Sequence, residues 1–255
     1  MEARHTCQNC GHHYADAFCC HCGQKTAHRI TLKHIGHDLV HAFTHADKGF
    51  FFLLKQLFIR PGVVAREYIV EGKRKKYFNP FQYLLIIGSI GVIIAVNTHL
   101  FEKSMALDTT ATAIEKDNQI ADIASLFSKY YNFILLINIP FLALGSYWVF
   151  KKHKFNYAEH LTLNTFFVAQ VAIFNYVGML MIYININLGL AFLFVLIPLI
   201  LTYFSTAYTR FFHERNFRGV LKALLSYFLG IFMQTIVIMI IGFVSFSIYK
   251  VLVSK

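Results

Sequence analysis

Four cysteines near the start of the chain have the spacing of metal ligands. They belong to two CxxCG units, one from Cys7 to Gly11 and one from Cys19 to Gly23, with eight residues between the inner cysteines. Each CxxC turn presents two thiolates to one metal, and the following glycine permits the tight backbone turn that such a knuckle needs. This pattern predicts one zinc ion bound by Cys7, Cys10, Cys19 and Cys22.

The predicted zinc site is closed, because four thiolates leave no open position for catalysis. A segment of about 25 residues cannot build its own core, so the metal is expected to be a folding staple. The short spacer indicates a tight hairpin packed by Tyr14 and Phe18. Docking to a partner or to nucleic acid, a redox role for Cys20 and metal sensing are alternatives. Side chains that could replace a cysteine ligand are Cys20, His12, His13 and His21.

A second group of possible metal ligands follows in residues 29–80. Apolar residues at helical spacing, Leu32, Ile35, Leu39 and Phe43, face away from four histidines, His34, His37, His41 and His45. Histidines at this spacing could bind a second metal or sense pH near neutrality. The alternative is a polar helix face that contacts solvent or lipid headgroups.

Long apolar stretches show what must position these groups. Hydrophobic residues make up 56% of the chain, mean hydropathy is +0.51, and there are 27 phenylalanines, too much apolar surface for a soluble domain of this size. A helix needs about 20 apolar residues to cross a bilayer. Five segments qualify: Phe81–Leu100, Tyr131–Phe150, Leu161–Tyr183, Leu188–Thr209 and Ala223–Tyr249. The expected fold is an all-α membrane bundle of about five spans with a zinc-ribbon-like head and amphipathic juxtamembrane helices.

The domain boundaries follow from these features. Residues 1–28 form the zinc-ribbon module, residues 29–80 the amphipathic juxtamembrane segment, and residues 81–255 the membrane domain. The apolar stretch from Gly49 to Ile59 is too short to cross a membrane and should lie in the interface or against the spans. Pro61 is typical of the first turn of a further helix, and Gly72 of its C-terminal end.

Basic residues predict the orientation in the membrane. If five spans alternate, 19 of the 24 lysines and arginines lie on the side of the N-terminus and 5 on the other. The positive-inside rule then predicts a cytosolic N-terminus and an outside C-terminus. The chain opens with polar residues instead of a signal peptide, so the first span should direct insertion. The cytosol keeps thiols reduced, which favours metal binding over disulfides.

A basic run precedes the first predicted span. It is expected to bind anionic lipid headgroups, and topology explains the formal charge of +11 better than nucleic-acid binding does. Its members are Lys73, Arg74, Lys75 and Lys76.

Polar residues inside the spans are candidates for a path or a site. At 100° per residue His160, Asn164 and Asn175 share one stripe, which begins beside Glu159, and Asn138 lies on the preceding span. Buried ionisable groups in a membrane often serve function, but amides and hydroxyls also join neighbouring helices. Both interpretations stay open at this point.

Several sequence strings resemble one family. The chain resembles the bacterial membrane proteins grouped as domain of unknown function 3667, on the knuckles that end Cys22-Gly23-Gln24 and on the strings 47–50, 60–62, 68–69, 72–80 and 156–160. The resemblance implies a zinc-ribbon head on a membrane domain in a bacterial inner membrane, without an established activity.

Three classes of function compete. A membrane-anchored regulatory or assembly protein, whose head docks a partner protein or the membrane surface, ranks first because the motifs concentrate in and beside the head. A small channel or transporter with a path beginning at Glu159 and His160 ranks second. An enzyme is the least supported, because convergent acid-base or nucleophilic motifs are missing.

Overall fold

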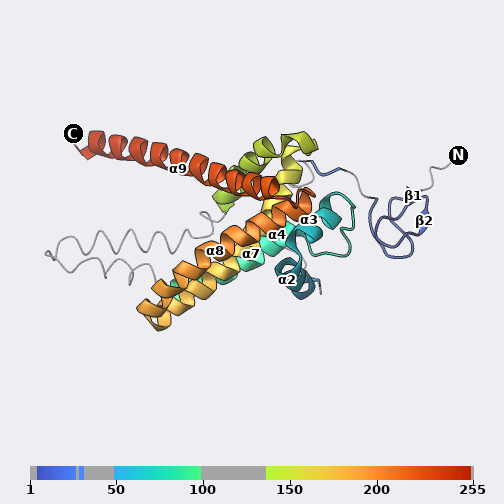
Figure 1. The fold of residues 1–255 in the computed structure, drawn as a ribbon, viewed down its shortest axis with the longest axis horizontal. Helices are drawn as coiled ribbons and strands as arrows, with labels where there is room; N and C mark the ends of the chain where they lie inside the picture. Colours follow the sequence, from blue (N-terminus) through green and yellow to red (C-terminus); the bar gives the residue numbers. More distant parts are fainter. Residues whose placement is uncertain (1–4, 27–28, 32–48, 99–135, 254–255) are drawn as a thin grey trace.

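The computed structural model describes residues 5–26, 29–31, 49–98 and 136–253, and this part of the chain is mostly helical (Figure 1). A small head with two short strands lies beside the end of a helical bundle. The histidines predicted to share a face, His34, His37, His41 and His45, lie outside the described residues.

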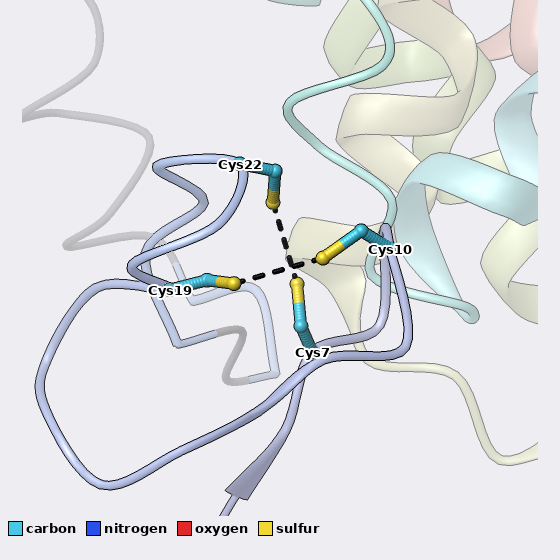
Figure 2. A group of neighbouring side chains, drawn as sticks. All are labelled: Cys7, Cys10, Cys19 and Cys22. Atoms are coloured by element: carbon cyan, nitrogen blue, oxygen red, sulfur yellow. Dashed lines mark hydrogen bonds between the residues drawn. The ribbon is translucent and has the colours of Figure 1, made fainter.

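The head is built from two similar turns. Strand β1 (His5–Thr6) pairs antiparallel with β2 (His13–Tyr14), with His5 opposite Tyr14. The Cys7 N–H donates to the His12 carbonyl and the Cys19 N–H to the Gln24 carbonyl, both at 2.8 Å. The glycines after each CxxC unit have positive φ, +76° and +71°, which a side chain would oppose. Both knuckles therefore close as the CxxCG pattern predicts, and their cysteines face one another (Figure 2).

Two short helices lead from the head to the bundle. Helix α2 (Phe50–Ile59) ends at Arg60, whose extended φ of −147° lets Pro61 start α3 (Pro61–Ile69) in a new direction. Leu53 and Leu57 of α2 are fully buried against α3 and α7, whereas Phe51 is 76% exposed. The short apolar segment thus packs against the bundle on one face and leaves the other open.

The bundle places four long helices and one shorter one around a common core. Helix α4 (Pro80–Thr98) packs along α7 (Tyr157–Ile184), and α7 along α8 (Ile186–Phe211). A shorter helix over Leu136–Val149 meets α9 (Phe217–Val253), which contacts α8 and then diverges from the other helices (Figure 1). Asparagine side chains cap the starts of four helices: Asn79, Asn156, Asn185 and Asn216.

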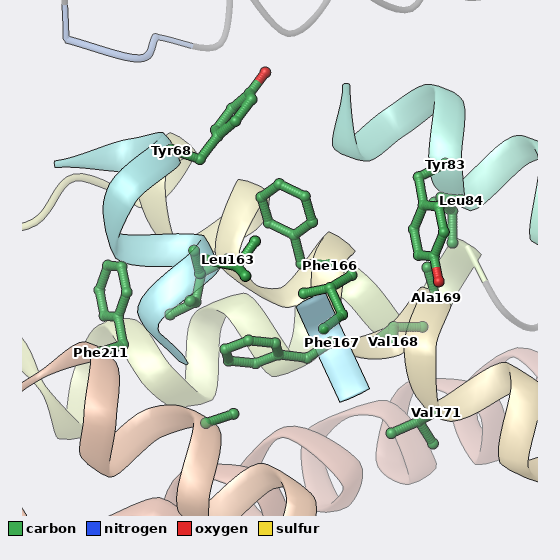
Figure 3. Packing of buried hydrophobic residues seen from close by; sticks show 14 of the residues in the cluster. Tyr68, Tyr83, Leu84, Leu163, Phe166, Phe167, Val168, Ala169, Val171 and Phe211 are labelled. Carbon is green, nitrogen blue, oxygen red and sulfur yellow. The ribbon is translucent and has the colours of Figure 1, made fainter. Parts of the chain in front are cut away.

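The core is aromatic and centres on α7. Phe166 and Phe167 are fully buried, and the Phe166 ring lies edge-on to Tyr68 of α3 at 5.3 Å (Figure 3). Tyr83 of α4 and Phe211 of α8 reach the same cluster. Burial of such rings gives a large apolar contact area, which fixes the N-terminal half of α7 between α3, α4 and α8.

Four helices are long and apolar enough to cross a membrane, by length and composition: Pro80–Thr98, Tyr157–Ile184, Asn187–Phe211 and Phe217–Ile241. These agree with four of the predicted spans to within several residues. The remaining prediction, Tyr131–Phe150, falls partly outside the described residues, and its described part is the shorter apolar helix Leu136–Val149. A count of five spans therefore stays a prediction.

Replacing Gly62 with alanine is expected to lower the thermal stability of the purified protein. A Cβ at this position would overlap the Ala207 carbonyl oxygen and lie 2.9 Å from the Phe211 N atom, so α3 would have to move away from α8. Overpacking of this kind typically costs about 1–3 kcal/mol. Melting in detergent, followed by intrinsic fluorescence, measures the loss.

Gly178→Ala is the matched control, because its Cβ would meet only ends of side chains, the Phe192 ring at 3.3 Å and the Leu196 Cδ2 atom at 3.7 Å. Equal melting temperatures for the Gly62 and Gly178 variants would contradict the tight crossing of α3 and α8.

Candidate functional site

The four predicted cysteine ligands converge in the head. The sulfur atoms of Cys7, Cys10, Cys19 and Cys22 all lie within 4.8 Å of one another (Figure 2). The Cys7 and Cys22 sulfurs are 3.5 Å apart, and those of Cys10 and Cys19 are 3.6 Å apart. Zinc bonded tetrahedrally at about 2.3 Å holds its sulfurs about 3.8 Å apart. The donor set and its spacing therefore fit one metal ion of the zinc type.

Thiol chemistry at this cluster also favours a cation. The backbone N–H of Gln24 stabilises the Cys22 thiolate and lowers its pKa to about 6. At Cys10 the His12 N–H acts in the same direction, but desolvation and the neighbouring thiols outweigh it and raise the pKa to about 12. Four adjacent thiols cannot all ionise without a positive charge among them, and a metal ion supplies it.

The alternative ligands lie outside the cluster. Cys20, His12, His13 and His21 are exposed, the His12 and His21 rings stack at 5.5 Å, and His13 bonds to Thr6 at 3.0 Å. Of the two residues predicted to pack the hairpin, Tyr14 is buried, but Phe18 is 56% exposed. The prediction for Phe18 is therefore wrong, because the buried cluster of the small head consists of Cys7, Tyr14 and Cys19 and does not cover the ring.

Gln24 attaches the head to the juxtamembrane segment, a contact that the sequence analysis missed. Its side-chain NH₂ donates to the Gly72 carbonyl at 2.8 Å, and its side-chain oxygen accepts the Lys75 N–H at 3.1 Å. Gln24 is 4% exposed. The only sequence signal was its place directly after the second knuckle.

Acidic neighbours already engage two residues of the basic run. Lys73 pairs with Glu71 at 2.7 Å, and Lys76 pairs with Glu67 at 2.5 Å. Burial opposes ionisation of Glu67, but hydrogen bonds from Lys76 and Tyr77 outweigh it and lower the pKa of Glu67 below its usual range. Lys75 remains exposed, and Arg74 is half-buried. Headgroup binding by the run stays a prediction.

Glu159 holds the start of α7 and binds the segment that follows the head. It completes a capping box with Asn156, accepting the Asn156 N–H at 2.7 Å and donating its own N–H to the Asn156 side chain at 2.8 Å. Both carboxylate oxygens also accept from the Arg29 guanidinium, at 2.9 and 3.0 Å. The carboxylate is 7% exposed, so this residue of the predicted path is closely surrounded by partners.

His160 and Asn164 belong to one buried hydrogen-bonded network. The Ser146 hydroxyl bonds to His160 Nδ1 at 2.9 Å and accepts from Asn164 at 3.0 Å. The Tyr208 hydroxyl donates to Asn164 at 2.5 Å. His160 Nε2 has no hydrogen-bond partner among the described residues, and three rings surround it: Tyr147, Phe155 and Phe212. The network joins α7, α8 and helix 136–149.

The rest of the predicted stripe lies apart from this network. Asn175 is half-buried about three turns further along α7. Asn138 is half-buried on helix 136–149. A second polar contact that the sequence analysis missed joins α4 to α7, where Tyr83 donates to Gln170 at 2.7 Å. The structure therefore shows separate polar contacts at several levels of the bundle.

The loops predicted to be cytosolic meet at one end of the bundle. Glu214 bonds to Lys222 at 2.6 Å and to His153 at 2.9 Å, and the Lys222 contact lowers the pKa of Glu214. Asn156 donates to the Ile30 carbonyl at 2.9 Å. The head, residues 151–156 and residues 213–216 therefore lie at one end of the helices, and the side of the membrane that this end faces stays a prediction.

Comparisons with known proteins bear on the juxtamembrane segment. No curated protein and no solved structure matches the chain significantly. Residues 47–91, which contain α2, α3 and most of α4, match the family model described as Protein of unknown function (DUF3667), and this match supports the family resemblance.

Proposed function

We propose that this chain is a membrane-anchored regulatory or assembly protein whose metal-binding head docks a partner protein at the membrane surface. The main support is the ion pair between Arg29 and Glu159, which ties the segment after the head to the capped start of α7. Together with Gln24 this contact fixes the head in one orientation. A surface that is already ordered loses less entropy when a partner binds.

The head offers such a surface. Phe18 is 56% exposed, and the stacked His12 and His21 rings are exposed as well. Aromatic side chains are enriched where proteins bind one another. A closed four-thiolate site supports a structural role for the metal, so the chemistry of the head is recognition and not catalysis.

The finer features of the proposal follow from the charges and the cysteines. The bound metal is zinc, the head lies in the bacterial cytosol, and five spans of the inner membrane bring the C-terminus outside. Reporter fusions at Lys255 and between residues 101 and 130 test the orientation. A cytosolic signal from the C-terminus would exclude an odd number of spans.

Photo-crosslinking in intact membranes tests the function. A photoreactive phenylalanine analogue at Phe18 is expected to give one discrete protein adduct, which disappears when Cys7 and Cys22 are changed to serine. The same analogue at Phe217, which is 76% exposed at the start of α9, is the control. Adducts no stronger at Phe18 than at Phe217 would count against a partner at the head.

A small channel or transporter is the second candidate, and one observation favours it. His160 Nε2 is buried without a partner among the described residues, so it can accept a bond from water or bind a cation. Ion flux in liposomes that is lost in a folded Glu159→Gln variant would favour this candidate over the first.

A further inference from the structure

A pocket of about 770 Å³ lies where the head meets the start of the first span. Residues of the head, including Gln24 and Lys25, form one wall, and the segment from Arg74 to Asn79 forms another. Tyr68 of α3 and Gln82 in the first turn of α4 complete it. The side chain of Gln24 joins these two walls through its hydrogen bonds to Gly72 and Lys75.

The charge of this pocket is one-sided. Of the lining residues that the structure describes, none is acidic and four are basic: Lys25, Arg74, Lys75 and Lys76. Glu67 lies outside the lining and pairs with Lys76. Among the residues that the structure describes, Lys25 and Lys75 have no acidic partner, and both side chains are exposed. Excess positive charge of this kind attracts anions, and ammonium groups bind phosphate well.

The position of the pocket indicates where the anion comes from. Gln82 belongs to the first turn of a candidate span, so the pocket lies where that span would enter the bilayer. Gly49 lines the pocket directly before α2, and Phe52 of α2 stacks on the lining residue Tyr77 at 5.9 Å. Phe51 and Phe52 are 76% and 41% exposed. An apolar surface therefore continues from the basic pocket.

We propose that this pocket binds the phosphate-bearing headgroup of an anionic membrane lipid, whose acyl chains lie along the exposed face of α2. A headgroup there contacts the head and the membrane domain at once. Phe18 also lines this pocket. The lipid site differs from the partner surface at Phe18 in its chemistry, because it selects a charged lipid by phosphate and not a protein.

Lipid binding to the full-length protein in neutral detergent tests the proposal. Native mass spectrometry measures the binding of phosphatidylglycerol, of phosphatidylcholine and of inorganic phosphate to the protein. The measurements compare an anionic lipid headgroup with a zwitterionic one and with free phosphate. We expect phosphatidylglycerol to bind in preference to phosphatidylcholine and millimolar phosphate not to displace it. The double variant Lys25→Gln, Lys75→Gln should weaken phosphatidylglycerol binding roughly thirtyfold, because it removes two basic groups that attract the anionic lipid.

The matched control removes the same charge at the same end of the bundle but outside the pocket. Lys151→Gln, Lys152→Gln should change the affinity by less than about twofold. Unchanged metal content and a single size-exclusion peak establish that the pocket variant is folded, and Lys75→Arg should keep binding. Equal losses in the two double variants, or phosphate binding as tight as lipid binding, would overturn the lipid site without affecting the crosslink expected at Phe18.

Discussion

Changing Cys7 and Cys22 to serine together is expected to remove the bound metal and unfold the head. These two sulfurs lie 3.5 Å apart, and each comes from a different knuckle, so the variant breaks both halves of the cluster. Structural zinc contributes about 10–16 kcal/mol to the folding of comparable peptides. Elemental analysis should find one zinc per wild-type chain and none in the variant, and limited proteolysis should cut the variant within residues 1–28.

Cys20→Ser provides the control, because Cys20 lies beside the ligands in sequence but outside the cluster. It should keep the full amount of zinc and the protease resistance of the wild type. Equal zinc in the Cys7, Cys22 variant and the wild type would show that other groups bind the metal.

Changing Glu159 to glutamine is expected to lower the stability of the folded protein by about 2 kcal/mol. The variant loses the charged bond to Arg29 and weakens the capping box, interactions worth about 1 kcal/mol or more each. The Arg29 side chain is 58% exposed, so solvent screening reduces the contribution of its ion pair with Glu159 to stability. For a chain of this size the melting temperature should fall by roughly 5 °C, while any ion flux stays unchanged.

Glu71→Gln is the matched control, since Lys73 is the one ion-pair partner of Glu71 among the described residues and the Glu71 side chain is 42% exposed. It should change stability by less than about 0.5 kcal/mol. Combining Glu159→Gln with Arg29→Gln should cost less than the sum of the two single changes. Additive costs would contradict a direct interaction between the two side chains.

The sequence was sufficient for features that local residues determine. The cysteine cluster was predictable because a CxxC turn and its glycine fix the positions of two thiols within a few residues. The apolar stretches located α4, α7 and α8 closely. Helix α7 begins at Tyr157, several residues before the predicted Leu161. The prediction from hydropathy missed this first turn because the capping residues Asn156 and Glu159 are polar. The Asn-x-x-Glu spacing was a readable start signal that hydropathy alone conceals.

Contacts between distant segments were not predictable. Gln24 meets Gly72 across 48 residues, and Tyr208 meets Asn164 across 44. The helical stripe grouped His160, Asn164 and Asn175 by angle, but angle says nothing of which neighbouring helix supplies a partner. That information lies in the packing of α7 against α8 and helix 136–149, where Ser146 and Tyr208 complete the network.

The distance in sequence between Arg29 and Glu159 has a consequence for biosynthesis. The two residues are 130 positions apart, and Arg29 leaves the ribosome first. At about 5–20 residues per second, Glu159 follows roughly 10 s later. The head can therefore take up its metal while the first span is still being inserted, and it attaches to the start of α7 only afterwards. Nascent chains arrested before residue 154 should carry a metal-loaded head that proteases can still separate from the membrane.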